Sequence, residues 1–74
     1  MGYSVQLVTL NRKANGRLLG VRLGRTCIKH GISVVSVAAE LGVSRQTIYN
    51  WFSGVNAPFG PRVETVKALI AAYK

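Results

Sequence analysis

The sequence predicts a mainly α-helical bundle of four to five helices, preceded by a short N-terminal β-strand or extended arm. Apolar residues recur at helical spacing after residue 16, whereas residues 3–10 are β-branched and aromatic with partial alternation. A chain of 74 residues has the size of one domain, so residues 1–74 are treated as a single unit. Within it we expect the strand or arm over residues 1–11, the helical bundle over residues 16–73 and a closely connected helix pair over residues 34–53.

The predicted strand, residues 3–10, reads Tyr-Ser-Val-Gln-Leu-Val-Thr-Leu. The sequence offers no second strand, and a lone strand cannot satisfy its own backbone hydrogen bonds. Two interpretations therefore stay open. The segment pairs with its copy in another protomer as an antiparallel ribbon, or it is an extended arm. The first, which we favour, predicts a homodimer held through residues 3–10.

A first helix is predicted over residues 17–30, because apolar residues such as Leu23 and Cys27 recur on one face. Gly20 and Gly24 interrupt it and weaken it by roughly 1 kcal/mol each relative to alanine. We expect close packing against a neighbouring helix to offset this loss.

Capping residues mark the remaining helices. Ser33 opens a helix over residues 34–41, and Ser44 opens another that runs to about Ser53. Pro61 stands in the first turn of a last helix. Glycines are expected to end the first three helices, at Gly31, Gly42 and Gly54.

The charge balance indicates a polyanionic partner. Ten lysines and arginines face two acidic residues, for a net charge of +8 that opposes folding by self-repulsion. No run approaches the ~20 apolar residues of a membrane span, and the N-terminus lacks the basic region and cleavage site of a signal peptide. We therefore expect no membrane contact and a cytoplasmic setting.

Residues 34–53 meet the physical demands of a helix-turn-helix, in which two short helices cross through a tight turn. Gly42 suits a left-handed backbone in the turn, and Val43 plugs it. Ala38 is the small residue at the crossing. The apolar residues that must face inward are Val37, Leu41, Ile48 and Trp51.

Residues 31–54 resemble the Cro/C1 repressor family, and the likeness extends over residues 16–73. It implies a small lambda repressor-like bundle that binds double-stranded DNA, and a transcriptional regulator, in action a repressor, of a phage, plasmid or other bacterial mobile element. Such a protein acts at the bacterial nucleoid. Asn56 becomes a candidate DNA contact by likeness to the family's loop, with a turn-forming role as the equal alternative. Val34 departs from the family, which commonly has a phosphate-binding glutamine there, and the strand-like N-terminal segment is not a usual family feature.

The outward face of the helix after Ser44 carries side chains that suit base reading. Arginine pairs with guanine, and glutamine or asparagine pairs with adenine. We expect Arg45 and Gln46, with Tyr49 or Asn50, at base edges. The full candidate set is Ser44, Arg45, Gln46, Thr47, Tyr49, Asn50, Ser53, Asn56, Arg62 and Arg17.

Phosphate contacts are expected at the start of that helix, from its free N–H groups and the hydroxyls of Ser44 and Thr47, and also outside it. Arg62 opens the last helix, and Arg17, Arg12 and Lys13 can reach phosphates if their connector lies along the DNA backbone. A further row of cations on the first helix is interpreted as a solvated face, namely Arg22, Arg25 and Lys29.

Other functions are less well supported. One histidine, one cysteine and two carboxylates offer no acid–base pair, nucleophile or metal cluster, so we expect no enzyme, catalytic residue, cofactor or metal. A binder of RNA or single strands would expose its aromatic residues, whereas Trp51, Phe52 and Tyr73 fall at core spacing. Two alternatives stay open: an antitoxin that binds a partner protein and regulates its own promoter, which co-purification of that partner would identify, and an excisionase-like factor that bends DNA.

Overall fold

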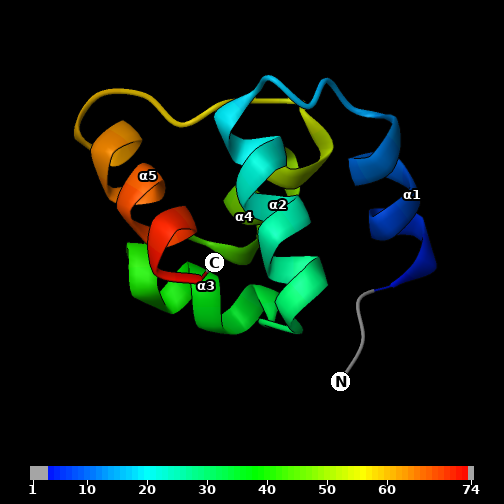
Figure 1. Cartoon of the computed structure of the whole chain (residues 1–74), viewed down its shortest axis with the longest axis horizontal. Coiled ribbons are helices and arrows are strands. Elements are labelled where there is room, and N and C mark those ends of the chain that lie inside the picture. The colour runs from blue at the N-terminus through cyan, green and yellow to red at the C-terminus, as the bar shows by residue number, and fades with distance from the viewer. Residues whose placement is uncertain (1–3, 74) are drawn as a thin grey trace.

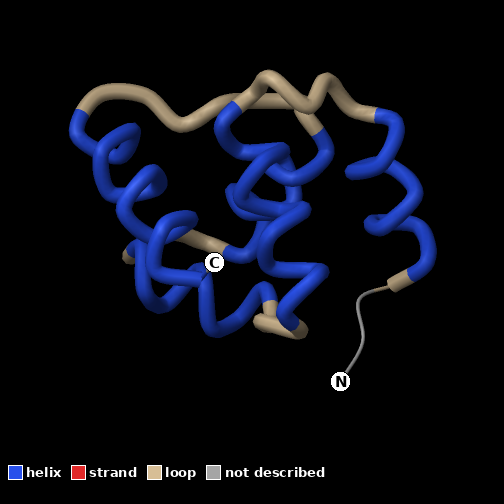
Figure 2. Tube along the Cα trace, in the orientation of Figure 1, coloured by secondary structure: helices blue, strands red, loops and turns tan. Residues whose placement is uncertain are grey.

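The computed structural model describes residues 4–73, which form a bundle of five α-helices (Figure 1). The helices are α1 (Val5–Lys13), α2 (Leu19–His30), α3 (Val34–Leu41), α4 (Arg45–Ser53) and α5 (Pro61–Tyr73). Loops and turns join them, and every regular element in the described part of the chain is a helix (Figure 2). The predicted helical bundle is confirmed.

The predicted N-terminal strand is wrong, because this segment forms helix α1. Ser4 caps the helix, and its Oγ accepts a hydrogen bond from the backbone N–H of Leu7 at 3.1 Å. Leu7 and Asn11, four residues apart, both turn into the protein, which is helical spacing. A ribbon of paired strands and an extended arm are therefore both excluded for the described residues. Tyr3, the first residue of the expected strand, lies outside them.

Helix α2 lies at the centre of the bundle, with α1 on one side, α5 on the other and α4 packed along it (Figure 1). Helix α3 packs on α4 and α5. These helices enclose one hydrophobic core, which contains every inward residue predicted for the helix-turn-helix. The core residues are Leu7, Leu23, Cys27, Val34, Val37, Ala38, Leu41, Ile48, Trp51, Phe52, Val66 and Ile70.

The two glycines of α2 let its backbone lie directly against α4. A Cβ atom on Gly20 would stand 2.7 Å from Cβ and 2.9 Å from the carbonyl oxygen of Trp51. A Cβ atom on Gly24 would stand 2.8 Å from Cγ of Phe52. A larger side chain at Gly20 would collide with the backbone of Trp51, and one at Gly24 would collide with the side chains of Phe52 and Asn11. The close packing predicted for these glycines is confirmed.

Two polar side chains fasten α1 to the rest of the bundle. Asn11 is only 3% exposed, and its Nδ2 donates to the carbonyl oxygens of Val21 on α2 at 3.2 Å and of Phe52 on α4 at 2.7 Å. Arg25, which is exposed as expected, also has a structural role. Its Nη2 donates to the carbonyl oxygens of Arg12 and Ala14 at the C-terminal end of α1. Helix α1 is thus an integral part of the fold.

Asn11→Ala should lower the free energy of unfolding by about 1–3 kcal/mol, because it removes the donor to two buried carbonyls. Urea denaturation measures this change. Arg12→Ala, at an exposed neighbour on the same helix, is the control and should change stability by less than about 0.5 kcal/mol. Equal stability of Asn11→Ala and the wild type would show that α1 is not fastened in this way.

Gly20→Ala should destabilise the fold, although alanine favours a helix by roughly 1 kcal/mol relative to glycine. The new methyl group meets the backbone of Trp51, which cannot rotate away, so we expect a net loss of about 1–2 kcal/mol. Thermal unfolding followed by circular dichroism measures it, with the exposed substitution Lys29→Ala on the same helix as control. A higher melting temperature for Gly20→Ala would contradict the close approach of α2 and α4.

Candidate nucleic-acid interface

The turn before α4 sets the direction in which this helix leaves the core. Gly42 has a left-handed backbone (φ 67°), which a residue with a side chain rarely adopts, and the N–H of Val43 donates to the carbonyl oxygen of Ala38 at 3.0 Å. Ser44 is extended and caps α4, since its Oγ accepts from the N–H of Thr47 at 3.1 Å. The hydroxyl groups of Ser44 and Thr47 also share a hydrogen bond of 2.9 Å.

The inner face of α4 is fully packed. Ile48 and Phe52 are 0% exposed and Trp51 is 4% exposed. This face cannot turn outward without opening the core. The opposite face is thereby held toward solvent, with Arg45 and Gln46 exposed near the N-terminal end of the helix.

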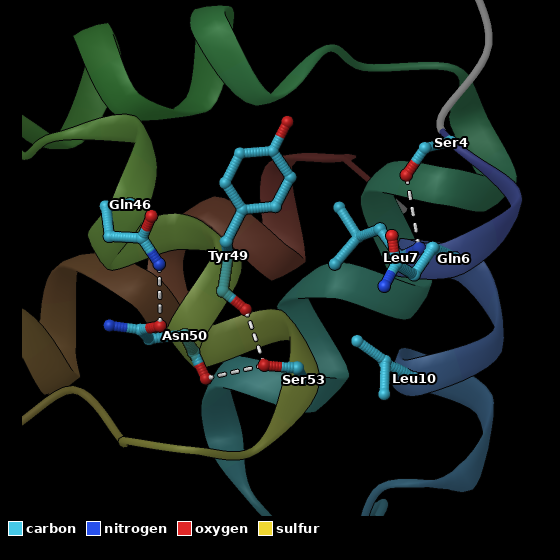
Figure 3. Close-up of a pocket in the computed structure, with 8 residues that line it drawn as sticks. All are labelled: Ser4, Gln6, Leu7, Leu10, Gln46, Tyr49, Asn50 and Ser53. Atoms are coloured by element: carbon cyan, nitrogen blue, oxygen red, sulfur yellow. Dashed lines mark hydrogen bonds between the residues drawn. The ribbon is translucent and has the colours of Figure 1, made fainter.

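Two amide side chains on the outward face pair with each other. Nε2 of Gln46 donates to Oδ1 of Asn50 at 3.0 Å, one helical turn away (Figure 3). The pair still has the acceptor Oε1 of Gln46 and the donor Nδ2 of Asn50 for a ligand. One acceptor and one donor are what the edge of adenine requires in the major groove of DNA.

Two other outward residues of α4, Tyr49 and Ser53, are less available to a ligand. Tyr49 is 40% exposed, and its carbonyl oxygen accepts from Oγ of Ser53 at 2.7 Å (Figure 3). The hydroxyl proton of Ser53 is therefore used within the helix, and this side chain can act toward a ligand mainly as an acceptor.

A groove of about 580 Å³ runs along one flank of α4 and brings together three of the candidate residues, Thr47, Asn56 and Arg62. Asn56 and Arg62 are exposed, and the backbone N–H of Asn56 donates to the carbonyl oxygen of Asn50. Phe59, in the same loop, lines this groove with 83% of its surface exposed.

A second groove, of about 270 Å³, runs along the other flank, between α4 and α1 (Figure 3). It is lined by the capping residue and three residues of α1 that sequence reasoning missed, Ser4, Gln6, Leu7 and Leu10. The signals that point to this helix are the capping Ser4 and the helical spacing of Leu7 and Asn11.

Arg17 lies apart from both grooves beside α4. It is exposed on the connector between α1 and α2, and its backbone N–H donates to Oδ1 of Asn15 at 2.9 Å. The structure therefore gathers most of the candidate residues around α4, whereas Arg17 lines neither of the two grooves.

The interface is basic. Arg45 and Arg62 are the charged residues of α4 and of its groove with the following loop, and no acidic residue lines either groove. Glu64 lies 3.7 Å from the ammonium group of Lys67 on the exposed side of α5. An anionic ligand would thus meet positive charge without local compensation.

The remaining reactive groups are few. Burial raises the pKa of the Cys27 thiol to about 12, so this side chain stays protonated at neutral pH and is a core residue. In residues 4–73, no three His, Cys, Asp or Glu side chains gather where they could hold a metal ion. None of the helices described here is long and apolar enough to cross a membrane.

A family model described as helix-turn-helix matches residues 21–74. The match runs from within α2 to the end of the chain and leaves α1 outside it. The chain matched none of the curated proteins and none of the solved structures with which it was compared.

Ser44→Ala should lower the free energy of unfolding by about 1 kcal/mol, because it removes the cap of α4. Ser44→Asp should keep near wild-type stability, since a carboxylate also accepts from the N–H of Thr47. Urea denaturation of the two variants tests the cap, and equal destabilisation by both would contradict it.

Proposed function

Because the chain belongs to the Cro/C1-type helix-turn-helix family of DNA-binding regulators, we propose that it is a sequence-specific transcription regulator that acts as a repressor and reads the major groove of double-stranded DNA with α4. One observation carries the proposal: α4 has a completely buried face, formed by Ile48, Trp51 and Phe52, and an opposite face of polar side chains with an arginine near its start. Such a helix is fixed from behind and free to enter a groove.

Base reading is assigned to the N-terminal half of α4. Arg45 stands in its first turn, and its exposed guanidinium group suits the O6 and N7 acceptors of guanine. Gln46 and Asn50 act as one unit toward adenine, because the hydrogen bond between them leaves an acceptor and a donor unused. Tyr49, with its ring partly exposed, supplies an apolar contact suited to a thymine methyl group.

Backbone contacts are assigned to residues beside these. Phosphates meet positive charge and hydrogen-bond donors at the groove between α4 and the following loop, where Asn56 and Arg62 are exposed. The first N–H groups of α4 attract phosphate as well. The further candidates for backbone contact are Ser44, Thr47, Ser53 and Arg17. Val34 offers no polar group, so we assign no phosphate contact to its side chain.

We expect two copies of the domain to bind one site. A single α4 spans only a few base pairs, and helix-turn-helix proteins reach specificity with two half-sites about one helical turn apart. The dimer contact does not involve strand pairing, since the N-terminal segment is helical. Occupation of a promoter is sufficient for repression, and the resemblance favours a phage, plasmid or other mobile element and the bacterial nucleoid as its setting.

Selection from random duplex DNA followed by sequencing should yield a defined, palindromic site. Arg45→Ala should then weaken binding to that site by about 1–3 kcal/mol, or roughly 5- to 150-fold in Kd, and relax the preference at one base pair. Fluorescence anisotropy on the selected duplex and on single-base variants measures both effects.

Arg22→Ala is the matched control, since it removes the same charge from the face of α2 that points away from α4. It should change affinity little and leave base preference intact. If Arg45→Ala weakens binding to every duplex equally, Arg45 contacts phosphate only. If the wild type selects no preferred site, the proposal of sequence-specific regulation is wrong.

A further inference from the structure

We propose that α1 is a second DNA-contacting helix, which places the side that carries Gln6 and Lys13 on the sugar–phosphate rim of the groove that α4 enters. The inference rests on the proposed function of α4. It concerns a part of the chain that the family match leaves out, since the match begins at residue 21.

Helix α1 is held rigidly beside α4. Leu7 is 5% exposed within the core, and the buried amide of Asn11 donates to the carbonyl oxygen of Phe52 on α4 at 2.7 Å. Both anchors leave the helix from the same side. The other sides of α1 are thereby fixed relative to the outward face of α4.

The outward face of α4 and one side of α1 share a groove. The groove between them is lined on the α4 side by Gln46, Tyr49, Asn50 and Ser53, which are candidate DNA contacts. In Figure 3, Leu10 lies near Ser53, and the ring of Tyr49 stands between Gln46 on α4 and the α1 side of the groove. A duplex that contacts the outward face of α4 therefore also approaches α1.

Dimensions determine which part of the duplex meets α1. The major groove of DNA is about 12 Å wide, so its walls stand roughly 6 Å from a helix at its centre. Packed helices lie about 8–10 Å apart, axis to axis. The axis of α1 therefore falls over the rim, where the sugars and phosphates are, and not over the bases.

The side chains on this side of α1 suit such a rim. At about 100° per residue, Gln6, Leu10 and Lys13 lie along one stripe of the helix. The amide of Gln6 is exposed and has no hydrogen-bond partner among the described residues. An ammonium group and an amide bind phosphate oxygens, and the half-exposed Leu10 offers an apolar surface to a deoxyribose.

The neighbouring cation, Arg12, which the sequence also offered as a phosphate contact, faces a different side of α1, so we assign it no contact with the DNA backbone. It lines a separate groove between α1 and α2, together with Val8, Ile28 and Lys29. The two adjacent cations of α1 thus carry the same charge but face different surroundings, and this difference makes them a matched pair for an experiment.

Lys13→Ala and Arg12→Ala should be compared by fluorescence anisotropy over a range of salt concentrations. Each phosphate contact contributes about 0.9 to the slope of log K against log salt. We expect Lys13→Ala to reduce this slope by about 0.9, so that it loses roughly threefold less affinity than the wild type between about 50 and about 200 mM salt. The reduction should be equal on selected and random duplexes, because a backbone contact carries no sequence information. Arg12→Ala should keep the wild-type slope.

Cleavage of the DNA by an iron–EDTA group tethered to α1 shows directly where this helix lies on the duplex. The wild-type thiol, Cys27, is buried and its pKa is raised to about 12, so a new exposed cysteine is modified selectively. Gln6→Cys with the reagent attached should cut one strand at a fixed position within the selected site. Arg12→Cys, treated in the same way, should give only background cleavage. Urea denaturation confirms that each variant is folded.

Two results overturn the proposal: equal salt slopes for Lys13→Ala and Arg12→Ala, or equal cleavage from the two cysteine variants. These failures are distinguishable from failure of the proposed function. If the wild type prefers one site but Lys13→Ala and Arg12→Ala have the same salt slope, the role of α1 is refuted and base reading by α4 stands. If the wild type has no base preference but Lys13→Ala still reduces the salt slope, base reading by α4 is refuted and the backbone contact of α1 stands. Absence of DNA binding refutes both.

Discussion

The contact between the backbones of α2 and α4 is the constraint on which the rest of the molecule depends. At Gly20 the helix backbone lies against the main chain of Trp51, which has no alternative rotamer, and at Gly24 it lies against the buried side chains of Phe52 and Asn11. This contact fixes α4 firmly and turns its polar face away from the core. Because α1 and α5 also pack on α2, the same contact positions the grooves on both flanks of α4.

Most of the fold could be predicted from the sequence, because local signals and burial agree in α2 to α5. Capping residues such as Ser33 and Ser44, left-handed glycines such as Gly42, and helical apolar spacing all mark the same boundaries. The N-terminal segment was mispredicted because its β-branched and apolar residues are largely exposed, as Val5 is, and give no core pattern. One of its two buried positions is a polar residue, Asn11, which hydrophobic periodicity does not detect.

The candidate site also has features that the sequence predicts and features that it does not. Which residues of α4 face outward follows from the helical period once Ile48 and Trp51 are placed inside. The spacing of Gln46 and Asn50, one helical turn apart, allows a hydrogen bond between them, but the sequence alone does not show that this bond forms. The groove between α1 and α4 could not be predicted from the sequence, because it depends on how two segments distant in the chain pack together.

The division of α4 into a buried and an outward face has a consequence for how such a protein can diversify. The hydrogen bond of Gln46 goes to Asn50 on the same face, and neither side chain contributes to the hydrophobic core. Mutations on this face can therefore accumulate at little cost in stability, while the two glycines of α2 tolerate almost none. A scaffold built in this way can change the surface that α4 presents through a few substitutions, while its buried half keeps the same fold.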